Sequence, residues 1–312
     1  MRHRRFIVFT GVLMAVLAFA GSAAVAGTAG SGSEHSGRYE YYLALGDSLA
    51  AGWQPNPVTG VGHITSQGYT NDLAAQLRSR DRDLKYTDLG CPGETTTTML
   101  KGGCPFPEKY RSQIAAATAF LKAHRGARVL VTIDIGANNI DGCLNGSGID
   151  LHCVAAGFKA IRADLPKILA QLRAAGGRRT SVYGMTYYDP FLAVWLFGSA
   201  YHPLARQSVK LAGQFSGILD TIYRGFHVPV ADVSGRFRTD HFTPLVQLTP
   251  KERVPLNVAR ICQWTWMCAP APVGPNIHAN AAGYRQIACA FAEVIFEARS
   301  AARPAAAAAA RP

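Results

Sequence analysis

Four residues that could carry chemistry stand at the ends of apolar runs or before a helical pattern. Ser48, in Gly-Asp-Ser-Leu after the first run, is a nucleophile or a helix cap. Gly93 follows the second run, and glycine lets a backbone N–H approach a ligand closely. Asn138 follows the third run and has an amide that can donate to developing negative charge. His278, near the end of the chain, is a general base suited to work near pH 7.

These residues need a scaffold that brings them together. Short apolar runs alternate with longer helical patterns from residue 39 to residue 300, which predicts a three-layer α/β/α sandwich with a roughly five-stranded parallel sheet. Reacting groups in such sheets gather at the carboxyl ends of the strands. The predicted strands, apolar enough for burial on both faces, are Tyr39–Leu45, Leu84–Leu89, Arg128–Ile135, Thr180–Tyr187 and Val228–Val233. The predicted helices are Tyr69–Arg80, Pro107–His124, Val154–Ala175, Leu204–Tyr223 and one from a cap at Asn280 to about Arg299.

Two long connections, residues 189–202 and 234–277, depart from this alternation, and such connections often form sites. The first holds the apolar run Pro190–Phe197, which could line an acyl pocket, touch lipid or belong to the core. The second holds Trp264, Trp266 and Met267, which could form a pocket wall or fill space inside a loop.

The first residues are typical of a secretory signal. Three arginines precede an apolar run from Phe6 to Ala20, and small residues follow up to Ala26. The apolar core of about 15 residues is shorter than the roughly 20 that a membrane span needs. We therefore expect cleavage after Ala26 and a secreted, extracellular protein. The predicted organisation is a signal peptide at 1–26, a flexible segment at 27–38, one globular domain at 39–300 and a disordered, low-complexity tail at 301–312.

Six of the seven cysteines occur in close pairs, and export favours disulfides over free thiols or metal ligands. Six cysteines allow 15 connectivities, of which we predict nearest-neighbour pairing. The pairs are Cys91 with Cys104, Cys143 with Cys153, and Cys262 with Cys268. Their spacing does not fit a zinc site. The seventh, Cys289, lies in a helical pattern and is expected to be a buried, inert thiol.

Composition narrows the classes further. The chain has 312 residues, a formal charge of +12 and 48% hydrophobic residues, which excludes disordered and fibrous classes. The basic residues are scattered and no nucleic-acid motif occurs, so we expect no nucleic-acid partner. The positive charge serves solubility or attraction to anionic surfaces. No G-x-S-x-G elbow, phosphate-binding P-loop, H-E-x-x-H motif or EF-hand loop is present.

The four blocks around these residues resemble, in order and spacing, the signature blocks of the GDSL or SGNH hydrolases, which are serine esterases and lipases. The blocks are Gly46–Ala50, Leu89–Thr96, Asp134–Asn139 and Pro275–Asn280. The resemblance covers about residues 39–300 and implies the flavodoxin-like SGNH fold. It implies Ser48 as nucleophile and His278 as base, with an oxyanion hole from the N–H groups of Ser48 and Gly93 and the Asn138 amide. No metal or organic cofactor is implied.

The sequence departs from that pattern beside the base. The family usually has an aspartate three residues before its histidine, and here this residue is Pro275. Some secreted actinobacterial members with three disulfides are similar in lacking the acid and orient the histidine with a main-chain carbonyl. That resemblance implies that the Pro275 carbonyl accepts from Nδ1–H of His278. A remote carboxylate, Asp232 or Asp240, is the alternative.

The resemblance implies a secreted lipase or carboxylesterase that acts on small-molecule or lipid esters. A carbohydrate or polymer deacetylase, an acyltransferase with the same residues, and a noncatalytic surface-binding protein on the same fold are the alternatives. We further expect a monomer that makes transient contact with lipid or wall surfaces.

Overall fold

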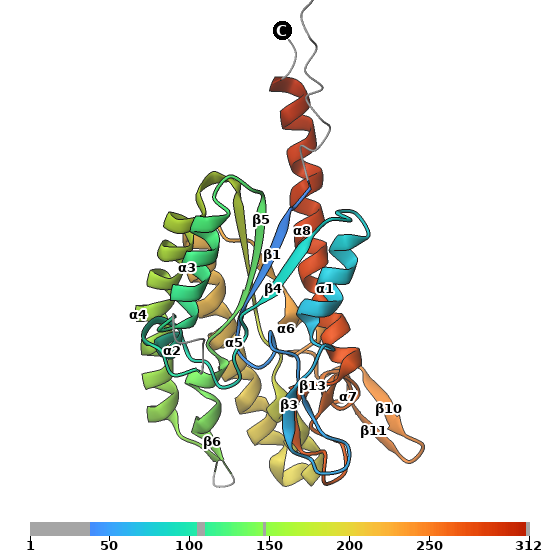
Figure 1. Ribbon diagram of the computed structural model, residues 1–312. Helices are drawn as coiled ribbons and strands as arrows, with labels where there is room; N and C mark the ends of the chain where they lie inside the picture. Colours follow the sequence, from blue (N-terminus) through green and yellow to red (C-terminus); the bar gives the residue numbers. More distant parts are fainter. Residues whose placement is uncertain (1–37, 105–109, 146–147, 310–312) are drawn as a thin grey trace, which may run out of the picture. The chain divides into compact units, whose positions relative to one another are not determined.

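The computed structural model describes residues 38–104, 110–145 and 148–309 (Figure 1). The expected signal peptide at 1–26 and the segment after it, up to residue 37, lie outside the described residues. In the described part of the chain, no helix is both long and apolar enough to span a membrane.

A five-stranded parallel sheet forms the centre of the fold. Its order is β4-β1-β5-β8-β9, with every neighbouring pair parallel. The strands are β1 (Tyr41–Gly46), β4 (Lys85–Asp88), β5 (Val129–Asp134), β8 (Thr180–Met185) and β9 (Val230–Ala231). All five predicted strands are therefore confirmed. The central strands β1 and β5 are almost entirely buried, which explains their continuous apolar sequence.

Helices cover both faces of this sheet (Figure 1). On one side α1 (Tyr69–Arg78) packs against α8 (Ala281–Ala309), where the rings of Tyr69 and Phe291 stack 5.2 Å apart. On the other side α4 (Leu151–Gly176) packs against α2 (Thr96–Lys101), α3 (Gln113–Ala123) and α5 (His202–Gly225). This confirms the three-layer α/β/α sandwich.

The last helix is longer than predicted. Its expected apolar stripe is buried, but helical backbone continues beyond Arg299 to Ala309, where we predicted a disordered tail. Alanine has the highest intrinsic helix propensity, so a run of alanines extends a helix without an apolar face to bury. The predicted end was wrong because it relied on the stripe alone.

The two long connections contain short elements that the sequence did not predict. The first forms the 3-10 helices η4 (Pro190–Phe197) and η5 (Ser199–Tyr201). The second forms α6 (Val233–Arg236), β10 (Leu245–Thr249), β11 (Glu252–Pro255), α7 (Leu256–Trp264), β12 (Thr265–Trp266) and β13 (Asn276–Ala279). The loops after β1 and β5 add β2 (Trp53–Pro55), β3 (Gly62–Ile64), η1 (Ala137–Asn139), η2 (Asp141–Cys143), β6 (Leu144–Asn145) and β7 (Gly148–Ile149). A further 3-10 turn, η3 (Gly177–Arg179), follows α4.

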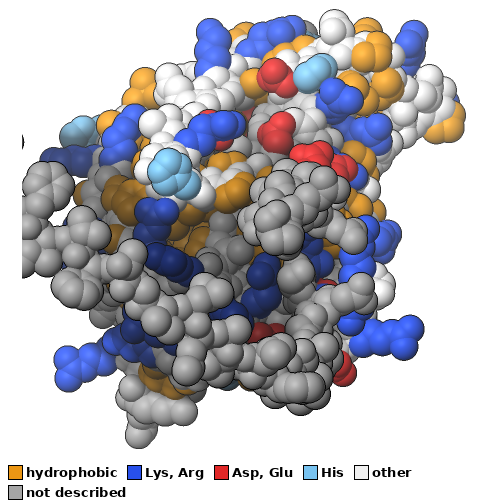
Figure 2. Space-filling view, turned by 90° about the horizontal axis from the view of Figure 1, so that it is seen from above, with side chains coloured by type: hydrophobic (Ala, Val, Ile, Leu, Met, Phe, Trp, Pro, Cys, Tyr) orange, Lys and Arg blue, Asp and Glu red, His pale blue; other side chains and the backbone are white. Residues whose placement is uncertain are grey.

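The six paired cysteines form three disulfides, Cys91–Cys104, Cys143–Cys153 and Cys262–Cys268, as nearest-neighbour pairing predicted. Cys289 is free but only half-buried, so the expected full burial was wrong. On α8 the core stripe includes Ala288 and Phe291, and residue 289 lies at the edge of that stripe. Figure 2 shows lysine and arginine side chains spread over one face and mixed with other types, as their scattered sequence positions indicate.

Candidate active site

The turn after β1 places Ser48 at the carboxyl end of the sheet. Gly46 has φ +146°, and a Cβ there would lie 2.3 Å from Oδ1 of Asp134, so no other residue fits this turn. The Asp47 carboxylate accepts the backbone N–H of Leu49 at 2.9 Å and fixes the turn. Ser48 is 9% exposed, and its side chain lines a pocket.

His278 reaches Ser48 from the far end of the sequence. It lies on β13, which pairs with β12, and the disulfide Cys262–Cys268 closes the segment that contains β12. Nε2 of His278 lies 2.8 Å from Oγ of Ser48, across 230 positions of sequence. The two residues therefore have the distance that proton transfer from the hydroxyl to the imidazole requires.

Asn276 holds the other ring nitrogen of His278. Its Oδ1 lies 2.7 Å from Nδ1 and also accepts the backbone N–H of His278 at 3.0 Å. Because the backbone N–H can only donate, it identifies the nearby side-chain atom as the amide oxygen. Nδ1 then carries the proton and Nε2 has the free lone pair that faces Ser48.

This arrangement corrects the expectation for Pro275. The acceptor at Nδ1 is the side chain of Asn276 and not the Pro275 carbonyl, because the Asn276 amide turns back over two residues to the backbone and ring of His278. Neither remote carboxylate takes this place. Asp232 accepts from Thr186 and from the backbone of Gly235, and Asp240 pairs with His241.

The buried position of His278 favours the neutral form of its imidazole. Burial lowers its pKa to about 4, since the charged form loses hydration. At neutral pH the ring is therefore unprotonated and able to accept a proton from Ser48.

Of the two other expected oxyanion donors, Asn138 is bound to Glu94, the residue that follows Gly93. Nδ2 of Asn138, on η1, donates to the Glu94 carbonyl at 3.0 Å, and Asn138 lines the same pocket as Ser48 and His278. Gly93, next to Glu94, has φ +82°, and a Cβ there would meet no atom within 4 Å, but Gly93 does not line that pocket. Asn139 binds Thr96 twice, through Thr96 N at 3.0 Å and Thr96 Oγ1 at 3.0 Å. The structure thus brings together Ser48, Asn138 and His278, with the Gly93 loop held beside them.

A buried carboxyl pair that the sequence analysis missed lies under the serine turn. Tyr69 donates to Oδ1 of Asp134 at 2.5 Å, Asp47 N donates to Oδ2 of Asp134 at 3.3 Å, and Tyr187 donates to Asp47 at 3.1 Å. Burial and the nearby Asp47 raise the pKa of Asp134 well above its usual range, because both disfavour the charged carboxylate. The signal for this pair was Asp134 itself, an acid at the end of a buried strand.

The pocket in front of Ser48 is mainly apolar. Its apolar wall includes Leu49, Ile140, Leu144, Val154, Leu211 and Phe215. Three carboxyl groups also line it, from Asp47, Asp141 and Asp189, and no lysine or arginine is among the described residues that do so.

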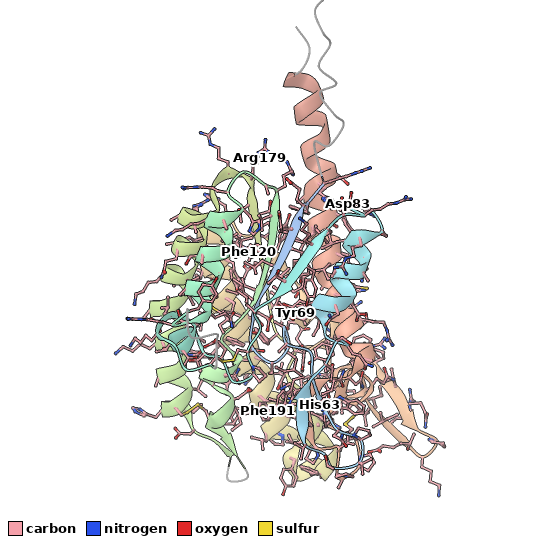
Figure 3. All side chains as sticks on the ribbon, in the orientation of Figure 1. His63, Tyr69, Asp83, Phe120, Arg179 and Phe191 are labelled. Carbon is pink, nitrogen blue, oxygen red and sulfur yellow. A yellow bond between two sulfur atoms is a disulfide. The ribbon has the colours of Figure 1, made fainter. Side chains whose placement is uncertain are left out.

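The apolar run of η4 is divided between the pocket, the core and the surface, and its contact with lipid stays a prediction. Pro190 and Phe191 line the pocket, Leu192 is buried in the core, and Phe197 is 70% exposed. In Figure 3, Phe191 lies at the same end of the sheet as His63 of β3, away from Asp83 and Arg179.

The tryptophans and methionine of the disulfide loop do not line the pocket. Trp266 donates from Nε1 to Gln54 at 2.8 Å. Trp264 packs edge-on against Phe237, and Met267 packs against the core. These side chains therefore fill space near the disulfide.

Several solved structures share this fold at low sequence identity. A protein of Parabacteroides merdae described as a GDSL-like lipase is 15% identical, with a TM-score of 0.52 over 83% of this chain and 96% of that one. Axe2, an acetylxylan esterase from Geobacillus stearothermophilus, is 16% identical, with a TM-score of 0.50 over 83% of this chain and 95% of its own. An extracellular lipase from Streptomyces rimosus is 19% identical, with a TM-score of 0.48 over 81% and 99% of the two chains.

No curated protein matches the chain. The family described as GDSL-like Lipase/Acylhydrolase matches residues 44–286, which is well over half of the 312 residues. The matched stretch contains Ser48, Asn138 and His278. The chain therefore belongs to the GDSL-like lipase/acylhydrolase family.

Proposed function

We propose that the protein is a secreted serine hydrolase that cleaves carboxylic esters. The observation that carries this proposal is the 2.8 Å contact between Ser48 Oγ and His278 Nε2, with the opposite nitrogen of the ring held by Asn276. A neutral base, a serine hydroxyl and a fixed tautomer are the groups that nucleophilic acyl transfer requires. The three disulfides support an oxidising, extracellular location.

The reaction proceeds in two acyl transfers. His278 takes the proton of Ser48 as the oxygen attacks the ester carbonyl, and the oxyanion forms against the N–H groups of Ser48 and Gly93 and the Asn138 amide. The protonated His278 then donates to the leaving alcohol as the tetrahedral intermediate collapses to an acyl-enzyme. Water activated by His278 attacks this acyl-enzyme and releases the acid. The Asn138 amide has two N–H donors, so one can bind the oxyanion while the other keeps its hydrogen bond to the Glu94 carbonyl.

The apolar pocket favours a lipase or carboxylesterase. Its leucine, isoleucine and phenylalanine side chains suit an acyl chain, which gains about 0.8 kcal/mol for each buried CH₂ group. A deacetylase is the second candidate because Axe2, which shares the fold, is an acetylxylan esterase. An acetyl group would make fewer contacts with these apolar side chains than a longer acyl chain.

Hydrolysis of p-nitrophenyl acetate, octanoate and palmitate tests the proposal. We expect turnover that is higher with the longer chains and abolished in Ser48→Ala. Asn138→Ala should lower kcat about 100- to 1000-fold, as the loss of an oxyanion donor does. The matched control is Ser79→Ala, an exposed serine at the end of α1, which should retain wild-type rates. Unchanged ester hydrolysis by pure Ser48→Ala would overturn the proposal, and cleavage of acetate alone would favour the deacetylase.

A further inference from the structure

The carboxylate of Asp141 stands in the catalytic pocket without a partner. Asp141 begins η2, three residues after Asn138, and lines the pocket. The other two acids of the pocket are satisfied: Asp47 accepts from Leu49 N and Tyr187, and Asp189 accepts from Phe191 N at 3.0 Å and Ser208 Oγ at 2.7 Å. No hydrogen bond or ion pair to the Asp141 carboxylate is found in the described residues.

Asp141 is partly exposed, and a carboxylate that lines a binding pocket without a hydrogen-bonding partner in the described residues is available to a ligand there. The pocket offers it no positive charge, because no described lining residue is a lysine or arginine, although the chain as a whole carries +12. The titratable groups that share the pocket are Asp47, Asp189, His278 and two tyrosines. The local field therefore favours a cationic ligand, opposite to the net charge of the protein.

Aromatic rings in the same pocket indicate which class of cation it would bind. Four of them, from Tyr187, Tyr188, Phe191 and Phe215, line it. The Tyr187 and Phe215 rings lie 5.2 Å apart, and the hydroxyls of Tyr187 and Tyr188 are held by Asp47 at 3.1 Å and by the Ile277 carbonyl at 2.8 Å. The two tyrosine rings are thus fixed with their hydroxyls occupied, and the Tyr188 ring also stacks on Phe237 at 4.5 Å. Aromatic faces attract weakly hydrated cations, and quaternary ammonium ligands above all.

We propose that this pocket binds a quaternary ammonium group of the ester substrate, with Asp141 as its counter-charge. The inference rests on the proposed function and names the substrate class of the same site. A quaternary ammonium fits better than a primary one, since it has no N–H groups that need acceptors from an apolar wall. Asp141 is a specificity-determining residue here and takes no part in the proton transfers.

The test compares butyrylcholine with 3,3-dimethylbutyl butyrate, an uncharged ester of the same shape, at pH 8. This pH suits the test because burial and the nearby Asp47 raise the pKa of Asp141 to about 7. We expect wild type to prefer the choline ester, and Asp141→Asn to reduce the ratio of the two kcat/KM values about tenfold, as the loss of one charged contact does. Using the ratio cancels any general loss of activity in the variant. Asp83→Asn is the matched control, since this exposed aspartate lies at the opposite end of the sheet from Phe191 (Figure 3), and its ratio should equal that of wild type.

A second measurement needs no turnover. Calorimetry of butyrylcholine with Ser48→Ala protein should detect binding, and the neutral ester should bind at least tenfold more weakly. Equal binding of the two esters, or an Asp141→Asn ratio equal to that of wild type, would overturn the inference, and hydrolysis of neutral esters by wild type would then leave the proposed function standing. Selective binding of butyrylcholine without Ser48-dependent hydrolysis of any ester would instead overturn the proposed function alone.

Discussion

Replacing Asn276 should slow ester hydrolysis without removing the nucleophile or the base. In Asn276→Ala the ring of His278 loses its only side-chain acceptor among the described residues, the Oδ1 atom 2.7 Å from Nδ1. The proton can then move to Nε2, where it blocks the lone pair that faces Ser48. Asn276 is a positioning residue, because it acts on the reaction through His278.

The structure sets the size of this effect. The hydrogen bond joins neutral groups in the resting protein, but it becomes charge-assisted once His278 takes the Ser48 proton, and such bonds contribute about 1.5 to 3 kcal/mol. Each 1.36 kcal/mol corresponds to about a tenfold change in rate. We therefore expect kcat to fall about 10- to 100-fold in Asn276→Ala.

The variant Asn276→Asp distinguishes an effect on the orientation of His278 from a general loss of protein structure. An aspartate keeps an acceptor near Nδ1 and adds a negative charge, which raises the pKa of a nearby histidine by about 1 to 3 units. Because burial lowers the pKa of wild-type His278 to about 4, the acidic limb of kcat/KM should lie near pH 4 in wild type. In Asn276→Asp the limb should move to between about pH 5 and pH 7, with activity at pH 8 retained.

The assay is the pH profile of p-nitrophenyl octanoate hydrolysis from about pH 3 to pH 9 for wild type and both variants. Asn71→Ala, at the start of α1, removes an asparagine acceptor away from the pocket and serves as the control. An acidic limb that does not move in Asn276→Asp, or wild-type kcat in Asn276→Ala, would refute the role of this side chain.

Two more predictions concern the support of the site. Reduction of the three disulfides should lower ester hydrolysis and Tm together. One disulfide begins two residues before Gly93, and another closes the segment that pairs with β13, which contains His278. Full activity after verified reduction would contradict this link. Asp134→Asn should gain stability relative to wild type as pH rises through the range above about 4. Burial and the nearby Asp47 raise the pKa of Asp134 in the folded protein, so the unfolded chain releases this proton first and the wild type loses stability until the folded carboxyl also ionises, whereas asparagine has no proton to release. Thermal unfolding across this range checks it, and a Tm difference that is independent of pH would refute it.

The sheet could be predicted from the sequence because each of its strands leaves a strong local signal. Strands such as β5 are buried on both faces, so their apolar residues run without interruption. The small paired strands were missed since they are short and irregular: β12 and β13 have two and four residues. Their pairing depends on contacts between distant segments, which no local pattern records.

The site residues that directly follow a strand of the sheet could be predicted from the sequence. Ser48 and Asn138 follow strands, and the topology rule brings strand ends together. The acceptor at Nδ1 was missed although its signal was present, since an asparagine two residues before a backbone N–H readily forms a side-chain turn. Asp141 and the tyrosines of the pocket carried no such signal, because their role depends on a cavity formed by several distant segments.

The missing aspartate beside His278 has a physical consequence for the base. A carboxylate at Nδ1 would stabilise the imidazolium, but it would also raise the pKa of the resting histidine and leave part of it protonated in mild acid. In this protein an uncharged amide fixes the tautomer, while burial keeps the ring neutral down to about pH 4. The arrangement gives up some stabilisation of the charged ring in the transition state and retains a working base over a wider range of acidic pH. The combination of Asn276 with a desolvated His278 therefore favours a hydrolase that stays active at pH 5, where a histidine paired with a carboxylate is largely protonated.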